Sequence, residues 1–343
     1  MLIFGLILLF FVLVDAGHPL WESSTKIKRA IPLDLSLDFT TTWPGGVVPF
    51  CWENDATRLE FIRDLHHAMN LWYTAGLPEP RFRFYEVSYE DCMRDRRNSL
   101  VIHKADGPLE FATTVGKYTG PPSDLLPGSV AYFNSETEIP SGRVARNTIA
   151  EKIAHEIGHI FGLYHEHQDP YFWRPPSPVF EIVCPSIEGF EQATEHLDIV
   201  EIYGPDGICV NQHTALYRGW NNVAHFLPIL ELAHLARPPP PHVPENSDVD
   251  WDSIMLYPST TALNQNRGGF TLRKAKNGRA YRIPIKRAPS TMDVQGLIYL
   301  YFAAEQRQLP RLYHDPRSEY YTAFQNLQNF QVCDWPPTGP RGG

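Results

Sequence analysis

The 343-residue sequence lacks an excess of basic charge and, after its first 16 residues, lacks any apolar run long enough to cross a membrane. Its 30 Lys and Arg residues stand against 39 Asp and Glu residues, so the formal net charge is −9. Such a chain offers no broad basic surface to a phosphate backbone, and we expect no nucleic-acid partner. Asn-x-Ser/Thr sequons are also absent, which excludes N-glycosylation.

The composition excludes a disordered or fibrous chain. Hydrophobic residues make up 43% and charged residues 20%, which is typical of globular proteins. The length permits one large domain or two smaller ones. The 31 prolines and 23 glycines, partly in clusters, indicate many turns and long loops rather than a helical bundle.

The amino-terminal region predicts secretion. Residues 2–14 form an uninterrupted apolar run, which is short for a membrane span but typical of the core of a signal peptide. Val14 and Ala16 provide the small residues expected before cleavage, so we predict a signal peptide over 1–16. After its removal we expect a secreted protein with no stable membrane association; a signal anchor that stays in the membrane is the alternative.

A dibasic pair, Lys28-Arg29, follows the predicted signal peptide. Cleavage after this pair would make residues 17–29 a short propeptide and Ala30 the new amino terminus. A solvated basic stretch that is not cleaved is the other interpretation.

Hydrophobic periodicity predicts regular elements in the first half of the chain. Apolar residues recur every three or four positions between Asn54 and Gly76, which predicts an amphipathic helix of about five turns capped by Asn54 or Asp55. Polar and apolar residues alternate over 81–87, and an apolar run covers 100–103; both patterns predict strands.

A second helix is expected near the middle of the chain. It would begin at Thr148, where Thr148 and Glu151 form a capping-box pattern, and end at Gly162. The following region around 170–247 is aperiodic and rich in proline, which indicates insertions and surface loops. One more short helix is predicted at residues 318–330.

This second helix contains the sequence HEIGHIFGLYH at 155–165. A step of four residues places His155 and His159 on one helix face, with Cβ atoms roughly 5 to 6 Å apart, so both imidazoles can bind one ion. Gly162 tolerates the positive φ of a helix end, and the chain beyond it can bring His165 back as a third ligand. Zinc prefers such nitrogen ligands, and three protein ligands leave a fourth position for water, as in catalytic zinc sites.

Glu156 follows the first histidine and is predicted to be the general base. A zinc ion lowers the pKa of its bound water towards roughly 7, and a carboxylate beside it can take the proton during attack on a carbonyl. This is the chemistry of peptide hydrolysis. Two alternatives stay open: histidines that are only packed or solvated, and a zinc site without catalysis.

The residues HEIGHIFGLYHE at 155–166 resemble the metzincin metalloproteases, and Glu166 after the third histidine makes the pattern similar to the astacin family. The sequence SIMLY at 253–257 is similar to the Met-turn of that family, and weaker similarity occurs at 43–50 and within 290–299. The resemblance implies a metzincin-like α+β catalytic domain. It would have a mixed sheet and long helices in its amino-terminal half, a mostly irregular carboxy-terminal half, and a zinc cleft between them.

The resemblance also implies roles for single residues. Met255 would form an apolar floor beneath the zinc, for which a thioether is well suited. Tyr257 would reach the metal in the free enzyme and support the oxyanion during turnover, because a phenol can donate a hydrogen bond. Glu166 would bind the newly formed amino terminus.

The predicted organisation places the astacin-like protease domain at 30–302, with insertions around 170–247, and a C-terminal extension at 303–343. A substrate would bind as an extended strand on a sheet edge. The segment 99–117 is the candidate edge; an ordinary surface strand is the alternative.

Several residues depart from the family pattern. Leu256 stands where the family's Met-turn has a histidine, and Gln168 begins a Gln-Asp-Pro sequence where the family continues with arginines. The propeptide aspartate of the family, in an F-x-G-D context, is missing. The resemblance therefore covers the metal ligands but not all of their surroundings.

The five cysteines do not follow the family's framework. An oxidising compartment favours two disulfide bonds and leaves one cysteine over. Cys184 with Cys209 would close an inserted loop and contribute roughly 3 kcal/mol. Cys51 with Cys333 would tie the tail to the first strand.

The sequence thus predicts a secreted zinc-dependent endopeptidase that acts on a protein or peptide substrate. The predicted catalytic residues are Glu156 and Tyr257, and the predicted zinc ligands are His155, His159 and His165. The second hypothesis is a non-enzymatic secreted module that keeps the zinc and binds another protein through its proline-rich insertions. A zinc hydrolase acting on a non-peptide acyl bond is the third.

Overall fold

A computed structural model describes residues 40–105, 111–121, 127–135, 149–175, 178–229, 243–264, 266–276 and 279–308. The predicted signal peptide, the dibasic pair, Thr148, Cys333 and the helix expected at 318–330 lie outside these ranges. The chain divides into two compact units, residues 1–300 and 301–343. Among the described residues, no helix is both long and apolar enough to cross a membrane.

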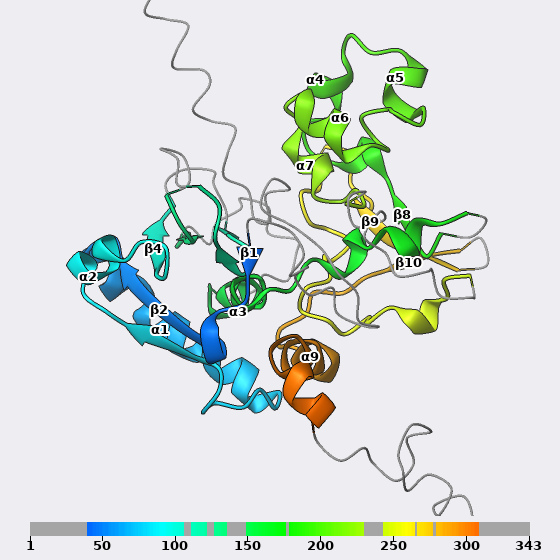
Figure 1. Cartoon of the computed structure of the whole chain (residues 1–343). Helices are drawn as coiled ribbons and strands as arrows, with labels where there is room; N and C mark the ends of the chain where they lie inside the picture. Colours follow the sequence, from blue (N-terminus) through cyan, green and yellow to red (C-terminus); the bar gives the residue numbers. More distant parts are fainter. Residues whose placement is uncertain are drawn as a thin grey trace, which may run out of the picture. The chain divides into compact units, whose positions relative to one another are not determined.

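The amino-terminal half contains a five-stranded mixed sheet (Figure 1). In spatial order its strands are β3 (Arg83–Glu86), β2 (Val47–Trp52), β4 (Leu100–Lys104), β7 (Val130–Phe133) and β5 (Ala112–Thr113). The first four pair in parallel, and β5 runs antiparallel to β7 at one edge. The strands predicted at 81–87 and 100–103 and the α+β class are therefore confirmed.

The segment 99–117, predicted as the substrate-binding edge, lies only partly at an edge. Its first part is β4, which pairs with β2 on one side and β7 on the other, so this part of the prediction is wrong. Its later part includes β5, which is an edge strand. An apolar pattern indicates a strand but not its place in the sheet, because that place depends on pairing between distant segments.

Helix α1 (Asp55–Thr74) confirms the predicted five-turn helix. The side chain of Asn54 caps it by accepting a hydrogen bond from the backbone N–H of Thr57 at 2.9 Å. Its buried apolar side chains are Phe61, Leu65, Ala68, Met69 and Trp72, whereas Leu59, at the start of the periodic pattern, is exposed. Gly76, which has a φ of 109°, follows the helix where the periodic pattern stops.

Helix α3 (Ile149–Phe161) packs against α1 and the sheet (Figure 1). Two buried indole N–H groups fix its position. Trp72 of α1 donates to the carbonyl of Ala154 at 2.8 Å. Trp43, which precedes β2, donates to the carbonyl of Ile160 at 2.9 Å. The metal motif predicted on this helix is therefore held by the fold of the amino-terminal half.

A short helix that the sequence pattern did not predict, α2 (Tyr89–Arg94), lies between β3 and β4 along the chain. It places Cys92 beside Cys51 of β2, and the two residues form a disulfide with 6.1 Å between their Cα atoms. The predicted pairing of Cys51 with Cys333 is therefore wrong. A helix of fewer than two turns gives no readable periodicity, so the sequence did not reveal what brings this partner close.

The carboxy-terminal half has long irregular stretches, as predicted, around small regular elements (Figure 1). An antiparallel sheet has the order β10 (Arg279–Arg282), β9 (Leu272–Lys276) and β8 (Phe180–Ile182). Its described part contains the helices α4 (Phe190–Thr194), α5 (Ile199–Tyr203), α6 (Gln212–Tyr217), α7 (Asn221–Ala224) and α9 (Thr291–Gln308). Within the described residues, 3-10 turns occur at Pro44–Gly46, Glu166–Gln168, Pro170–Trp173, Cys184–Ser186 and Asn246–Asp248. A separate ribbon pairs β1 (Thr40–Thr41) with β6 (Lys117–Tyr118).

Residues 184–224, here called the helical insertion, are more ordered than the expected loops. Their helices α4 to α7 surround buried apolar side chains such as Ile208 and Trp220. Cys184 and Cys209 form the predicted disulfide, with 5.9 Å between their Cα atoms. The insertion therefore packs on the apolar cluster that also contains Phe180 and Leu256, and a covalent bond closes it.

Candidate metal centre

The three predicted ligands come together at the end of α3. His155 and His159 lie on the helix, and Gly162, with a φ of 109°, ends it as predicted. The chain then turns so that the Nε2 atom of His165 lies 3.1 Å from the Nε2 atoms of both other histidines. His159 and His165 are fully buried and His155 is partly buried. The spacing read from the sequence thus predicts this group correctly.

Backbone carbonyls fix the ring orientation of the first two histidines. The Nδ1 atom of His155 lies 2.8 Å from the carbonyl oxygen of Ile254, and that of His159 lies 2.7 Å from the carbonyl oxygen of Leu163. A carbonyl oxygen can only accept, so each Nδ1 carries the proton and each Nε2 carries a lone pair. This is the tautomer that a metal-binding imidazole needs.

Gln168 fixes the third histidine. Its Oε1 atom accepts from the Nδ1 of His165 at 2.7 Å, and its amide NH₂ faces the carbonyl of Leu227 at 3.5 Å, which sets the orientation of the amide. The backbone of Gln168 is held as well, because its carbonyl accepts from the N–H of Ile229 at 3.0 Å. The side chain is fully buried. In the sequence, Gln168 was noticeable only as a departure from the family pattern.

The geometry leaves three lone pairs pointed at one another. Neutral imidazoles that all donate from Nδ1 cannot hydrogen-bond to each other through Nε2, so contacts of 3.1 Å between these atoms are unfavourable without a shared cation. Zinc binds such nitrogen ligands at about 2.0 to 2.1 Å in tetrahedral geometry. The residues present therefore fit a zinc ion held by three histidines.

Burial keeps the three imidazoles neutral. Desolvation lowers the pKa of His155 to about 4 and lowers the pKa values of His159 and His165 well below their ordinary value. Their mutual repulsion when charged acts in the same direction for His159 and His165. At neutral pH a metal ion therefore displaces no proton from these ligands.

Met255 is buried in a turn formed by residues 253–257, here called the Met255 turn. A Cβ atom added at Gly158 would lie 2.4 Å from the Met255 sulfur and 3.2 Å from the Trp72 ring. Gly158 is thus required by the close approach of this turn to α3. Sequence reasoning did not single out Gly158, because a glycine inside a helix gives no local sign of what packs on it.

Asp293, in the first turn of α9, holds the Met255 turn in place. Its carboxylate accepts from the Ser253 hydroxyl at 2.7 Å and from the Ile254 backbone N–H at 2.9 Å. The Ser253 oxygen in turn accepts from the Met255 N–H at 2.9 Å. Burial raises the pKa of Asp293 to about 6, although its hydrogen bonds lower it. The carbonyl of Ile254 that orients the first ligand is therefore positioned from α9.

Glu166 is buried directly beside the third ligand. Its Oε1 atom accepts from the backbone N–H of Asp250 at 2.9 Å, and its own N–H faces the Met255 carbonyl at 3.2 Å. Burial raises the pKa of Glu166 well above its ordinary value, and the nearby carboxylates of Asp250 and Asp293 act in the same direction. The predicted contact of Glu166 with a new amino terminus stays a prediction.

The two predicted catalytic residues lie next to the ligands. Glu156 follows His155 on α3, and its side chain is buried with 2% of its surface exposed. The half-buried ring of Tyr257 lies over the histidines, with its centroid 4.3 Å from that of His165 and 4.7 Å from that of His167. Leu256, which precedes Tyr257 in the chain, packs into the apolar core of the carboxy-terminal half, which accounts for an apolar residue at this position.

No family model matches this chain, and a search of curated proteins found no match. The fold and the site define an α+β protein with a buried three-histidine group that could hold a metal ion. The group is consistent with a zinc site of the HExxHxxGxxH type.

Proposed function

We propose that this protein is a secreted zinc-dependent endopeptidase similar to the astacins. The observation that carries the proposal is the convergence of three Nε2 lone pairs, each fixed by an acceptor at Nδ1. Three histidines leave one zinc position for water, which is typical of catalytic rather than structural zinc sites. The two disulfides support the oxidising compartment expected of a secreted protein.

Two residues of the chain would carry out the chemistry. A zinc ion at this site would supply Lewis acidity and lower the pKa of water towards about 7. Glu156 would take the proton of the attacking water and later deliver it to the leaving amine, because a carboxylate adjacent to the ligands can serve as base and then as acid. Tyr257 would donate a hydrogen bond to the developing oxyanion from its place over His165.

The substrate is proposed to bind as an extended strand beside β5. This strand (Ala112–Thr113) is an edge of the five-stranded sheet and pairs with β7 on its other side. An edge strand offers backbone N–H and C=O groups to an added peptide. Binding through the backbone would let the enzyme hold many sequences and select among them by side-chain pockets.

The test is cleavage of an unfolded protein by purified, zinc-loaded material, run beside the variant Glu156→Gln. We expect Glu156→Gln to keep its zinc and to lose at least 100-fold in kcat, since removing a general base costs about 10²- to 10⁴-fold. Zinc content is measured by metal analysis in the same samples. Equal cleavage by both proteins would show that Glu156 is not the base. No cleavage by either protein would overturn the proposal that this protein is a peptidase.

A non-enzymatic zinc-containing binding protein is the second candidate. The exposed apolar side chains of the helical insertion favour it, because they indicate a contact surface on this chain. The placement of Glu156 beside a ligand favours the peptidase, because a structural zinc site has no need of a base. Loss of cleavage in Glu156→Gln at equal zinc content would separate the two candidates.

A further inference from the structure

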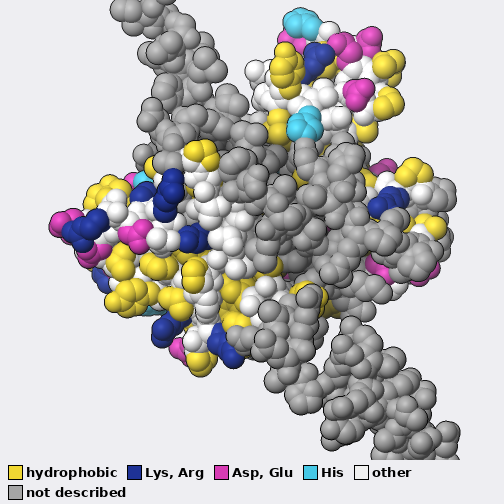
Figure 2. Space-filling view, in the orientation of Figure 1, with side chains coloured by type: hydrophobic (Ala, Val, Ile, Leu, Met, Phe, Trp, Pro, Cys, Tyr) yellow, Lys and Arg dark blue, Asp and Glu magenta, His cyan; other side chains and the backbone are white. Residues whose placement is uncertain are grey.

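The helical insertion exposes large apolar side chains that its own core does not use. The exposed fractions are 69% for Ile199, 64% for Val200, 42% for Tyr203, 41% for Val210 and 92% for Tyr217. Figure 2 shows hydrophobic side chains at the surface of this insertion with acidic side chains between them. Large apolar groups gathered on one surface are typical of sites that bind another molecule.

The exposed side chains of α5 are not needed to stabilise the helix or to pack it. It is stabilised at its start by a capping box, in which Asp198 accepts from two backbone N–H groups at 2.8 Å each and Glu201 accepts from the N–H of Asp198 at 3.0 Å. Ile202 packs on the core, whereas Ile199 and Tyr203, one helical turn apart, are exposed. The outer apolar face of α5 therefore does not take part in the packing of the insertion.

The charge of the insertion indicates the kind of partner. Between residues 188 and 222 the sequence has six carboxylates and one basic residue, Arg218. Arg218 pairs with Glu201 at 2.9 Å, and Arg267, from outside the insertion, pairs with Glu191 at 2.6 Å, so the insertion keeps an excess of carboxylates. The carboxylates are those of Glu188, Glu191, Glu195, Asp198, Glu201 and Asp206. A basic partner would be attracted to this surface, whereas a second copy of the insertion would be repelled.

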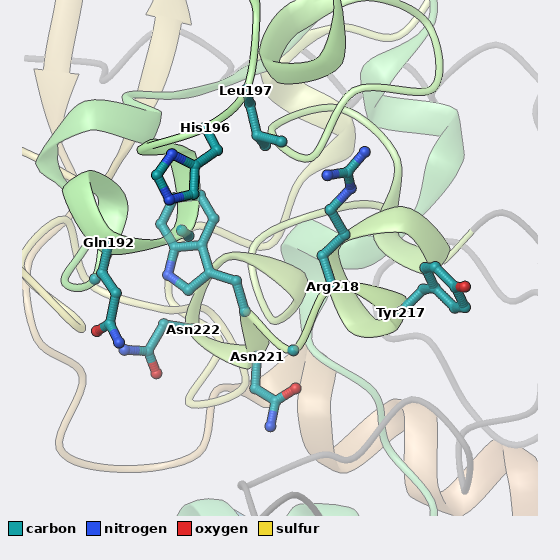
Figure 3. Close-up of a pocket in the computed structure, with 11 residues that line it drawn as sticks. Gln192, His196, Leu197, Tyr217, Arg218, Asn221 and Asn222 are labelled. Atoms are coloured by element: carbon teal, nitrogen blue, oxygen red, sulfur yellow. The ribbon is translucent and has the colours of Figure 1, made fainter.

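A pocket of about 730 Å³ adjoins the exposed face (Figure 3). Tyr217 and Arg218 line it, and Arg218 also pairs with Glu201, so this arginine links the pocket to α5. The other side of the pocket has amide and imidazole groups from Gln192, His196 and Asn222. No carboxylate lines it, so it suits an uncharged side chain of the partner.

We propose that the helical insertion binds a basic protein segment that carries large apolar side chains. These side chains cover the outer face of α5, and one of them enters the pocket beside Arg218. Lys and Arg residues of the segment pair with the surrounding carboxylates, which sets the partner's orientation and its rate of association. This surface binds whether or not the zinc site cleaves peptides.

The test measures the affinity of the full chain for synthetic peptides by fluorescence anisotropy. The Glu156→Gln background is used so that no peptide is cleaved. The probe is a labelled 18-residue peptide with Leu and Lys at helical spacing, and the comparison peptides replace Lys by Glu or Leu by Gln. We expect the Leu/Lys peptide to bind at least tenfold more tightly than either, and to weaken as salt is raised from 0.05 to 0.5 M.

Two double variants locate the binding. Ile199→Ser with Tyr203→Ser removes the outer face of α5, whereas Leu59→Ser with Tyr85→Ser removes side chains of similar exposure, 73% and 62%, from α1 and β3. All four positions are exposed, so both variants should melt like the parent. We expect the first variant to bind the Leu/Lys peptide at least tenfold more weakly and the second within twofold of the parent.

Three results would overturn the proposal. The first is that both double variants bind the Leu/Lys peptide with equal affinity, which places its binding elsewhere, for example in the zinc site. The second is equal binding of the Leu/Glu and Leu/Lys peptides, which removes the role of charge. The third is concentration-dependent dimerisation that Ile199→Ser with Tyr203→Ser abolishes in sedimentation, which assigns the face to a second copy.

Discussion

Each ligand histidine takes its orientation from an acceptor in a different part of the chain. Leu163 belongs to the same turn as its histidine, Ile254 lies about a hundred residues away, and Gln168 is itself held by Leu227. Such outer partners set the tautomer and the direction of the lone pair, so they contribute to metal affinity without touching the metal. The strength of zinc binding at this site should therefore depend on residues outside the ligand motif.

The substitution Gln168→Leu tests this dependence. We expect about 10- to 100-fold weaker zinc binding, because the Nδ1 of His165 loses its acceptor. Affinity is measured by competition with a chromophoric chelator. Gln212→Leu is the control, since Gln212 is also buried and donates to the Ala224 carbonyl at 3.0 Å in the helical insertion. Equal losses in both variants would point to general destabilisation instead.

A second prediction concerns the contact between Gly158 and Met255. Alanine favours a helix by about 1 kcal/mol over glycine. The added Cβ would nevertheless meet the Met255 sulfur at 2.4 Å, and overpacking of this kind costs about 1–3 kcal/mol, so Gly158→Ala should be destabilising on balance. Urea unfolding measures the change. Adding Met255→Ala to Gly158→Ala should relieve part of the clash. If the changes in the free energy of unfolding of the two single variants simply added in the double variant, the contact between these residues would be contradicted.

The elements around the site are joined by polar groups rather than by apolar packing alone. Helix α9 is tied to the Met255 turn by Asp293, and the Met255 turn is tied to α3 by the Ile254 carbonyl. In the sequence, residues 290–299 were noticeable only for a weak family similarity, which gave no role to Asp293. A buried carboxylate of this kind makes the stability of the junction depend on pH.

The sign of this pH dependence follows from the pKa of Asp293, which rises from 3.8 to about 6 on folding. The carboxyl group of Asp293 therefore holds its proton more tightly in the folded than in the unfolded state. Its contribution to the free energy of unfolding is fully present below about pH 4 and is lost as the pH rises through about 6. Asp293→Asn should remove this dependence, which amounts to roughly 2.5 kcal/mol between pH 4 and 7. Urea unfolding of both proteins in chelator measures it. Parallel pH profiles would mean that Asp293 does not titrate in this range.

At the scale of the molecule, the metal group joins segments that are far apart in sequence. Two ligands lie on α3 of the amino-terminal half, and their surroundings include Ile254, Leu227 and Asp293 from the carboxy-terminal half. A zinc ion that binds the folded but not the unfolded chain stabilises this arrangement by mass action.

Zinc should therefore raise the thermal stability of the whole chain. A free zinc concentration 100 times Kd would stabilise the folded state by about 2.7 kcal/mol, and a chelator would reverse this. Differential scanning calorimetry with and without zinc measures the shift in Tm. His159→Ala should melt at the same temperature in zinc and in chelator, and a full zinc response in this variant would place the ion elsewhere.

The sequence by itself determined the parts that depend on local spacing. The step of four from His155 to His159, the break at Gly162 and the return of His165 are properties of one helix and its end. The five-turn helix capped by Asn54 followed from periodicity in the same way. The α+β class was instead implied by the resemblance of the HEIGHIFGLYHE and SIMLY sequences to a known family.

The tertiary structure decided what depends on contacts between distant segments. It alone paired Cys51 with Cys92, placed β4 inside the sheet and β5 at its edge, and gave roles to Gln168 and Asp293. These features depend on which segments meet in three dimensions, and a hydrophobic period carries no information about that choice. The local chain therefore specifies the ligands, whereas long-range packing specifies how firmly and in which orientation they are held.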